Sequence, residues 1–238
     1  MRARALAAAA VLCLIADGCD RLPGRPRDGD RHVRPSQVRD FATLYDRNCA
    51  GCHGGEGRPG AALSLADPVY LALADDATIR RVASDGVAGT AMPAFAQSAG
   101  GTLTDDQIDV LVAGLRARWA RGGVGNAALP PYAAAPGDAR RGAAAYAAHC
   151  ADCHGDLGEG GVGGGSIVDG SYLGLVSDQG LRTAVLVGRP ALGMPDWRGD
   201  GRGPPMTAEE VADVVAWLVA KRPPFPGQPY PNEGEHDD

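Results

Sequence analysis

The 238-residue sequence predicts an all-α protein that consists of two tandem domains. The main observation is an internal repeat, since a C-x-x-C-H motif occurs at residues 49–53 and again at 150–154. A second observation is that the segments around each motif carry helix start signals. A third is the composition, with 35 glycines, 18 prolines and only 5% aromatic residues. Such a composition is typical of small, loop-rich domains whose cores are completed by something other than side chains.

The N-terminus has the features of an export signal. Residues 1–18 combine Arg2 and Arg4 with an apolar run too short to span a bilayer comfortably, as in a secretory signal peptide. Cys19 follows in a context that resembles a bacterial lipobox, in which the cysteine is lipidated and becomes the mature N-terminus. Ala16, where leucine is usual, and Asp17 are unusual for such a site, so ordinary cleavage and an uncleaved anchor are alternatives. Residues 19–35 are rich in proline and arginine and are expected to form a flexible tether.

Each copy of the repeat is expected to contain three helices at corresponding places. They are 36–48, 76–84 and a helix after Thr104 in the first copy, and 138–149, 178–187 and a helix after Thr207 in the second. Ser36 and Asp138 are the expected N-caps of the two first helices, whereas Thr104 and Thr207 open capping boxes. The predicted parts are domain 1, a linker, domain 2 and a Pro-rich acidic tail, at residues 36–120, 121–136, 137–222 and 223–238.

The two copies differ where their first and last helices are expected to cross. In the second copy, the small Gly142 would face the large Trp217. In the first copy the sizes are exchanged, and Phe41 would face Gly114. Because such an exchange keeps the summed volume at the crossing roughly constant, we expect the first and last helices to pack together at these residues in both domains.

The C-x-x-C-H motif is typical of covalent haem attachment. Two thiols add to the two vinyl groups on one edge of the porphyrin, and the adjacent histidine offers an imidazole nitrogen to the iron. The candidates are Cys49, Cys52 and His53 in the first copy, and Cys150, Cys153 and His154 in the second. The alternative is a four-cysteine zinc site shared between the copies. The presence of a histidine in each motif favours two covalently bound haem c groups.

Methionines are the candidates for the ligand on the opposite side of each iron. A thioether in that position raises the reduction potential and suits electron transfer. Met92 is the candidate in the first copy, because the other methionines lie elsewhere. In the second copy Met194, which also precedes a proline, competes with Met206. Met206 lies one residue before a helix cap, where methionine commonly only packs, so Met194 is the preferred candidate.

Two arginines recur at corresponding positions of the copies. Arg80 and Arg182 each lie in the predicted middle helix. A guanidinium can bind the carboxylates of haem propionates, so both residues are weak candidates for that contact. The alternative is that each arginine lies on a solvated helix face.

Together these features are similar to the class I cytochrome c family, in tandem diheme form. The resemblance rests on the two C-x-x-C-H motifs, the two Met-Pro pairs and the paired terminal helices, and it covers about 36–120 and 137–222. It implies that each domain has about four short helices around one covalent haem, with the first and last helices crossing. The second copy fits the family pattern at the crossing, and Phe41 and Gly114 of the first copy depart from it.

The resemblance implies an electron carrier without catalytic residues or a small-molecule substrate. The net charge of −6 also argues against a nucleic-acid partner. We expect a periplasmic cytochrome at the inner membrane, held by a lipid or signal anchor. It would carry single electrons between redox proteins such as a quinol-oxidising complex, a dehydrogenase, an oxidase or another cytochrome. One alternative is a fixed subunit of a quinol-oxidising or dehydrogenase complex. A diheme peroxidase or a haem-based gas sensor would need an open iron position, which two methionines disfavour.

Overall fold

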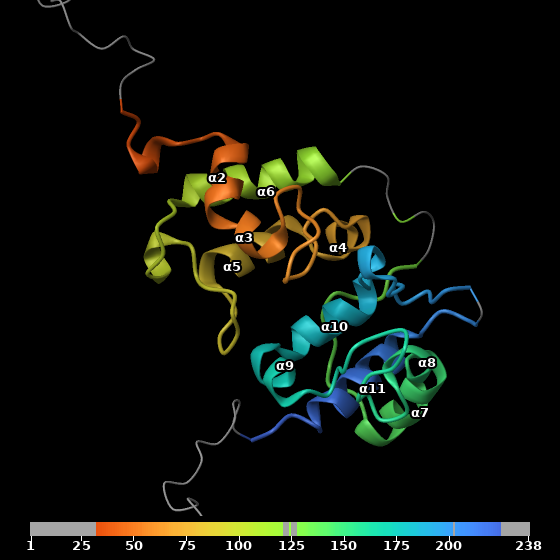
Figure 1. The fold of residues 1–238 in the computed structure, drawn as a ribbon. Coiled ribbons are helices and arrows are strands. Elements are labelled where there is room, and N and C mark those ends of the chain that lie inside the picture. The colour runs from red at the N-terminus through yellow and green to blue at the C-terminus, as the bar shows by residue number, and fades with distance from the viewer. Residues whose placement is uncertain (1–31, 121–123, 125–127, 202, 225–238) are drawn as a thin grey trace, which may run out of the picture. The chain divides into compact units, whose positions relative to one another are not determined.

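The structure is a computed structural model that describes residues 32–120, 124, 128–201 and 203–224. Within these residues the regular structure is helical, with two isolated β-bridges and no strand (Figure 1). Residues 39–238 belong to one compact unit, and the preceding residues form another. The predicted signal peptide, Cys19, most of the tether and nearly all of the acidic tail lie outside the described residues.

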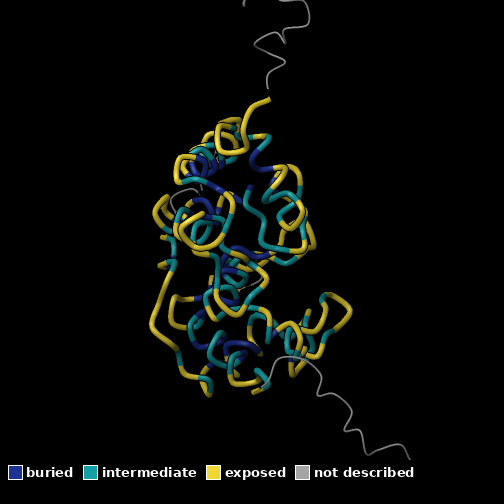
Figure 2. The backbone as a smooth tube through the Cα atoms, turned by 90° about the vertical axis from the view of Figure 1, so that its left-hand side faces the viewer, coloured by how far each residue is buried: buried dark blue, intermediate teal, exposed yellow. Residues whose placement is uncertain are grey.

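The helices follow the predicted repeat. In the first copy they are η3 (Pro35–Gln37), α2 (Phe41–Asn48), α3 (Ala50–His53), α4 (Pro68–Leu73), α5 (Asp76–Asp85), η4 (Gln97–Ala99) and α6 (Asp105–Trp119). In the second copy they are α7 (Ala139–His149), α8 (Ala151–His154), α9 (Gly170–Leu175), α10 (Asp178–Val187), η5 (Pro190–Leu192) and α11 (Ala208–Val219). Buried stretches alternate with exposed ones along both copies (Figure 2). Each domain is therefore a small all-α unit.

The helix starts agree with the sequence except at one place. Asp138 caps α7, and the capping boxes of Thr104 and Thr207 are both formed. The prediction of Ser36 as the N-cap of the first helix is wrong. Ser36 lies in the 3-10 turn η3, and α2 begins only after Asp40, whose carboxylate accepts a hydrogen bond of 2.8 Å from the amide of Thr43. Extended backbone at Val38 separates the two segments, so one continuous helix cannot form.

The first and last helices cross in both domains at the predicted residues. A β-carbon at Gly114 would overlap the ring of Phe41, so the glycine makes room for that ring between α2 and α6. A β-carbon at Gly142 would overlap the carbonyl of Asp213 and lie 2.8 Å from the β-carbon of Trp217. The exchange of large and small residues is confirmed. The backbones of α7 and α11 approach so closely that only glycine fits, whereas α2 and α6 are separated by a ring.

The first domain has a tryptophan at the crossing as well, but from another position of the last helix. Trp119 packs edge-on against Tyr45, with ring centroids 5.0 Å apart. In the second domain Trp217 stacks on Tyr146, with centroids 4.2 Å apart. Trp119 therefore packs on the tyrosine of the first domain as Trp217 does in the second. It does so from the end of α6, where the aligned residue of the second copy is Arg222.

An arginine near the end of each last helix ties it to the middle of its domain. Arg116 donates to the carbonyls of Leu71 and Ala74 and pairs with Asp76, and Arg222 donates to the carbonyls of Leu173 and Val176 and pairs with Asp178. These partners occupy corresponding places in the repeat. The tryptophan and the arginine thus occur in opposite order in the two copies, while each tryptophan packs on the equivalent tyrosine and each arginine bonds the equivalent carbonyls.

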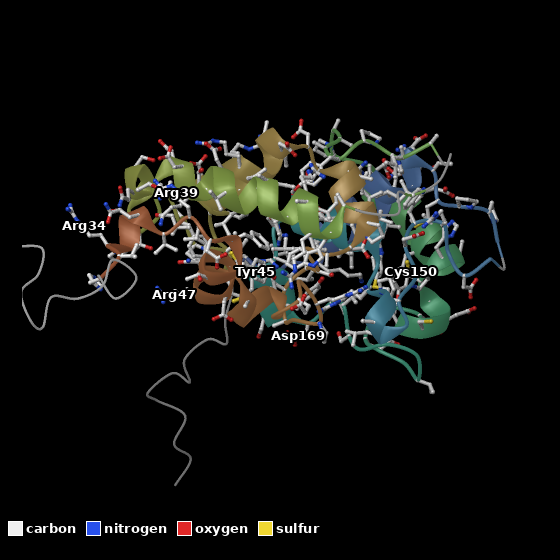
Figure 3. The ribbon with its side chains drawn as sticks, turned by 90° about the horizontal axis from the view of Figure 1, so that it is seen from above. Arg34, Arg39, Tyr45, Arg47, Cys150 and Asp169 are labelled. Carbon is white, nitrogen blue, oxygen red and sulfur yellow. The ribbon has the colours of Figure 1, made fainter. Side chains whose placement is uncertain are left out.

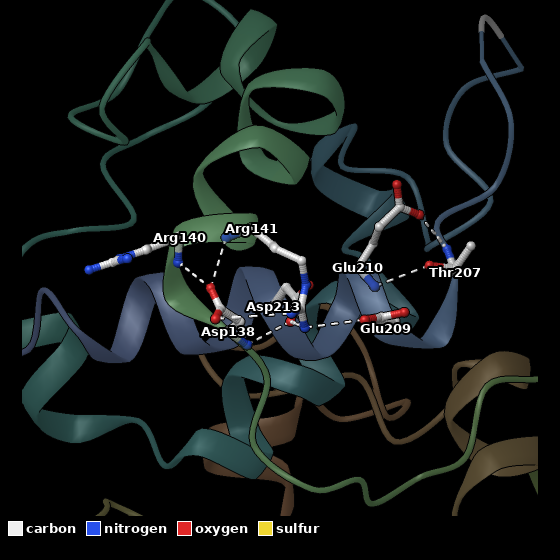
Figure 4. Close-up of polar contacts among 7 residues, drawn as sticks. All are labelled: Asp138, Arg140, Arg141, Thr207, Glu209, Glu210 and Asp213. Carbon is white, nitrogen blue, oxygen red and sulfur yellow. Dashed lines mark hydrogen bonds and ion pairs between the residues drawn. The ribbon is translucent and has the colours of Figure 1, made fainter.

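A buried carboxylate stabilises the α7–α11 crossing of the second domain (Figure 4). Asp213 is 3% exposed and accepts hydrogen bonds of 2.7 and 2.9 Å from the guanidinium of Arg141. It also accepts one of 2.6 Å from the amide of Asp138, at the start of α7. The hydrogen bonds from Arg141 hold the pKa of Asp213 below its usual value.

The second domain is therefore expected to lose stability in acid. A lowered native pKa means that the stabilisation is complete above the unfolded-state value of 3.8 and is lost as the pH falls through the native value. At neutral pH, Asp213→Asn should cost about 2 kcal/mol of the free energy of unfolding, because hydrogen bonds to a charged group are lost. That difference should shrink below pH 3.8 in acid-unfolding experiments. Asp109→Asn, at an exposed ion pair of α6, is the control, and an equal effect of both variants would contradict the prediction.

Candidate haem-attachment sites

The two cysteines of each motif lie on one side of a short helix. Cys49 ends α2, and the motif continues as α3, with the amide of His53 donating to the carbonyl of Cys49 at 2.9 Å. The second motif repeats this geometry, with a distance of 3.0 Å between the amide of His154 and the carbonyl of Cys150. Cys150 is labelled in Figure 3. Residues three apart on a helix share a face, so the two thiols of each motif can reach one edge of a porphyrin.

All four motif cysteines are free thiols. Cys49 and Cys150 are half-buried, and Cys52 and Cys153 are exposed. Burial raises the pKa of Cys49 and of Cys150 to about 11, so both are uncharged at neutral pH. Each motif thus offers one half-buried thiol and one at the surface.

The histidine of each motif is oriented by a backbone carbonyl. The Nδ1 atom of His53 lies 2.7 Å from the carbonyl oxygen of Leu63, and that of His154 lies 2.8 Å from the carbonyl oxygen of Gly165. Because a carbonyl only accepts, Nδ1 carries the proton and the lone pair of Nε2 is available to a metal. Burial also lowers the pKa of His53, which favours the neutral form that binds metals. This donor set fits a haem iron.

A tyrosine in each first helix fixes the chain just after the histidine. The hydroxyl of Tyr45, which is labelled in Figure 3, donates to the carbonyl of Gly54 at 2.9 Å, and that of Tyr146 donates to the carbonyl of Gly155. Both glycines have a positive φ, of 83° and 81°, which lets the chain turn away from the end of the motif helix. The sequence showed the two tyrosines at equivalent positions but not this contact.

The candidate methionine ligands lie in equivalent loops. The carbonyl of Met92 accepts from the amide of Val87 at 3.0 Å, and that of Met194 accepts from the amide of Arg189 at 2.9 Å. Both methionine side chains are half-buried. Met206, the competing candidate, is only 8% exposed and follows its own loop into the core of the second domain. Its burial supports a packing role and leaves Met194 as the better candidate.

The two candidate arginines have protein partners. Arg80 pairs with Asp105 at 3.6 Å and with Asp109 on α6. Arg182 is 4% exposed and donates to the carbonyl of Pro131 at 2.8 Å. The alternative interpretation, that Arg182 lies on a solvated helix face, is therefore wrong. Its Nη1 atom is buried and has no hydrogen-bond partner among the described residues.

The arrangement does not favour the zinc alternative. Within the described residues, which include all four motif cysteines, no three Cys, His, Asp or Glu side chains come together as a metal site.

In the part of the chain that the structure describes, no helix is both long and apolar enough to cross a bilayer.

Comparisons with known proteins agree with the repeat. The sequence profile described as cytochrome c oxidase, cbb3-type, subunit III matches residues 36–113 and 137–218. The cbb3-type cytochrome c oxidase subunit CcoP of Azospirillum sp. (strain B510) is 33% identical over 140 residues. That match covers 54% of this chain and 42% of the relative. A solved chain of the reducing HAO-like protein complex of Kuenenia stuttgartiensis aligns with 81% of this chain and 100% of its own, at 17% identity. Its TM-score of 0.42 is too low to bear on function.

Proposed function

The chain belongs to the family of cbb3-type cytochrome c oxidase subunit III, and we propose that it passes single electrons to such an oxidase at the periplasmic face of the inner membrane. It is a diheme electron-transfer cytochrome whose two haem c groups are held by Cys49, Cys52, Cys150 and Cys153. The oxidase as partner, the periplasmic location and the iron ligands are the proposed part of this function. The family match supports the proposal, and so does the likeness to CcoP. The match covers 42% of the length of CcoP.

The observation that carries the proposal is the paired histidine geometry. In both domains Nδ1 donates to a carbonyl, so that the lone pair of Nε2 of His53 and of His154 is left to bind an iron. Met92 and Met194 are the proposed ligands on the other side of each iron. A haem held between such a histidine and such a methionine would supply one-electron exchange between ferrous and ferric iron, and the two side chains would leave no position for a substrate. Two methionines in equivalent loops therefore favour electron transfer over a diheme peroxidase.

Two further residues belong to the proposal. Among the described residues, the Nη1 atoms of Arg80 and Arg182 are both buried without a hydrogen-bond partner, but Arg80 is ion-paired with aspartates, so Arg182 is the better candidate for a haem propionate. Cys19 is the proposed lipid anchor, on the evidence of the sequence.

Purification from detergent-solubilised membranes tests the partner. A fixed subunit should co-purify with an oxidase, a quinol-oxidising complex or a dehydrogenase, whereas a mobile carrier should not. The purified chain should show low-spin spectra and the far-red band of methionine-ligated ferric haem. A high-spin haem with peroxide turnover would contradict electron transfer as the function. A Cys19→Ser variant is the control for membrane attachment, and it should move to the soluble periplasmic fraction if the lipid is the anchor.

A further inference from the structure

Arg189 connects the two haem domains. We propose that this arginine joins the methionine loop of the second domain to the haem-attachment loop of the first, and that this contact sets the rate at which an electron passes between the two haems. The inference rests on the proposed function, because it takes Met194 to be an iron ligand.

The contact itself is a charged hydrogen bond across the two domains. The Nη2 atom of Arg189 donates to the carbonyl of Gly60 at 2.9 Å and lies 3.4 Å from the carbonyl oxygen of Ala61. Both domains belong to the same compact unit of the chain. A guanidinium that bonds backbone carbonyls of another domain holds a fixed piece of main chain, not a mobile side chain.

Each end of the contact is close to a haem-binding residue. On the second domain, the backbones of Arg189 and Met194 bond each other in both directions, at 2.9 and 3.2 Å. On the first domain, Gly60 and Ala61 immediately precede Ala62, whose amide donates to the carbonyl of Cys52 at 3.0 Å. A short path of hydrogen bonds, joined by the main chain from Gly60 to Ala62, thus leads from the proposed ligand of one iron to the attachment cysteine of the other haem.

The repeat provides an internal comparison for Arg189. Val87 is the equivalent residue of the first domain. It follows Gly86 as Arg189 follows Gly188, and both glycines have a φ of 67°. Val87 bonds the carbonyl of Met92 through its amide, as Arg189 bonds that of Met194. The methionine loop therefore forms without an arginine. The charged side chain is an addition of the second domain, and it donates to backbone carbonyls of the first.

Other contacts keep the two domains in register around Arg189. Helix α4 of the first domain touches α10 of the second. The end of the linker is fixed to α10, because Arg182 donates to the carbonyl of Pro131 at 2.8 Å and Gln179 donates to that of Tyr132 at 2.8 Å. These contacts hold the domains together, so that a change at Arg189 alters one junction and not the whole assembly.

The step assigned to this junction is the transfer of one electron. With haem bound in both domains, one would be oxidised from ferrous to ferric while the other is reduced from ferric to ferrous. No bond forms or breaks and no proton moves, so the protein has only to fix the distance and orientation of the two groups. Loss of the charge-assisted hydrogen bond would shift the population in which the Arg189 loop is joined to residues 60–61 about tenfold, which is the expected scale of the effect.

The test uses the full chain with both haems attached and the variant Arg189→Val, which installs the residue of the first domain. Arg140→Val is the matched control, since it removes the same charge from an exposed arginine of the second domain (Figure 4). In half-reduced protein, the haem-methyl NMR resonances report the exchange of the electron between the two haems. The far-red absorption band reports whether methionine ligation is intact.

Arg189→Val should slow the exchange about tenfold, with the far-red band unchanged, while Arg140→Val should exchange like the parent protein. Equal exchange rates in all three proteins would overturn the inference. Loss of the far-red band in Arg189→Val alone would overturn it too, because the arginine would then act within its own domain. Absence of the band from the parent protein would instead contradict the proposed Met194 ligand, which separates failure of the function from failure of the junction.

Discussion

A double variant, Cys150→Ala with Cys153→Ala, is expected to carry one covalent haem in place of two and to lose the fold of its second domain only. Without these thiols the second porphyrin cannot be attached. The domain then lacks the large apolar group around which its short helices pack, and the chain has few aromatic residues to replace it. Mass spectrometry of the intact protein should show the loss of one haem, and hydrogen exchange should show loss of protection in α7–α11.

The mirror variant is the control. Cys49→Ala with Cys52→Ala should remove the other haem and unfold α2–α6, while the second domain keeps its protection. A variant that still binds two haems, or one in which both domains unfold together, would contradict the assignment of one haem to each domain.

The second large effect is expected at the iron ligands. Met194→Ala should remove the far-red band of one haem and lower its reduction potential by an amount on the order of 0.1 V, because a thioether ligand favours ferrous iron. Met92→Ala should do the same to the other haem. Potentiometric titration followed by absorption spectroscopy measures both quantities in one experiment.

Met206→Leu is the matched control for Met194→Ala. Met206 is buried, and a swap of similar volume should cost less than about 1.5 kcal/mol and leave both potentials unchanged. If Met206→Leu removed the band and Met194→Ala did not, the two methionines would have exchanged roles.

Much of each domain could be predicted because its signals are local. Asp138, Thr104 and Thr207 cap helices with side chains that act within one turn, so their positions fix the helix starts. The start of the first helix was misplaced because Ser36 and Asp40 are both good caps, and only the extended backbone between them decides.

The contacts that escaped prediction all depend on distant parts of the chain. Trp119 and Arg116 could not be matched to Trp217 and Arg222, because an alignment by position places each tryptophan opposite a different residue. The equivalence of the two tryptophans appears only from the tyrosines they pack on, and that of the two arginines only from the carbonyls they bond. Arg189 was one of several arginines in the sequence, and its partner at Gly60 lies more than a hundred residues earlier in the chain.

The exchange of sizes at the helix crossings also protects the assembly of the chain. Two similar domains on one polypeptide can misfold by pairing a helix of one with the partner helix of the other. Here α2 on α11 would bring Phe41 against Trp217, and α7 on α6 would leave a void between Gly142 and Gly114. Both wrong pairings are disfavoured, one by overlap and the other by a cavity. The duplicated helices therefore discriminate between the native partner and its close copy during folding.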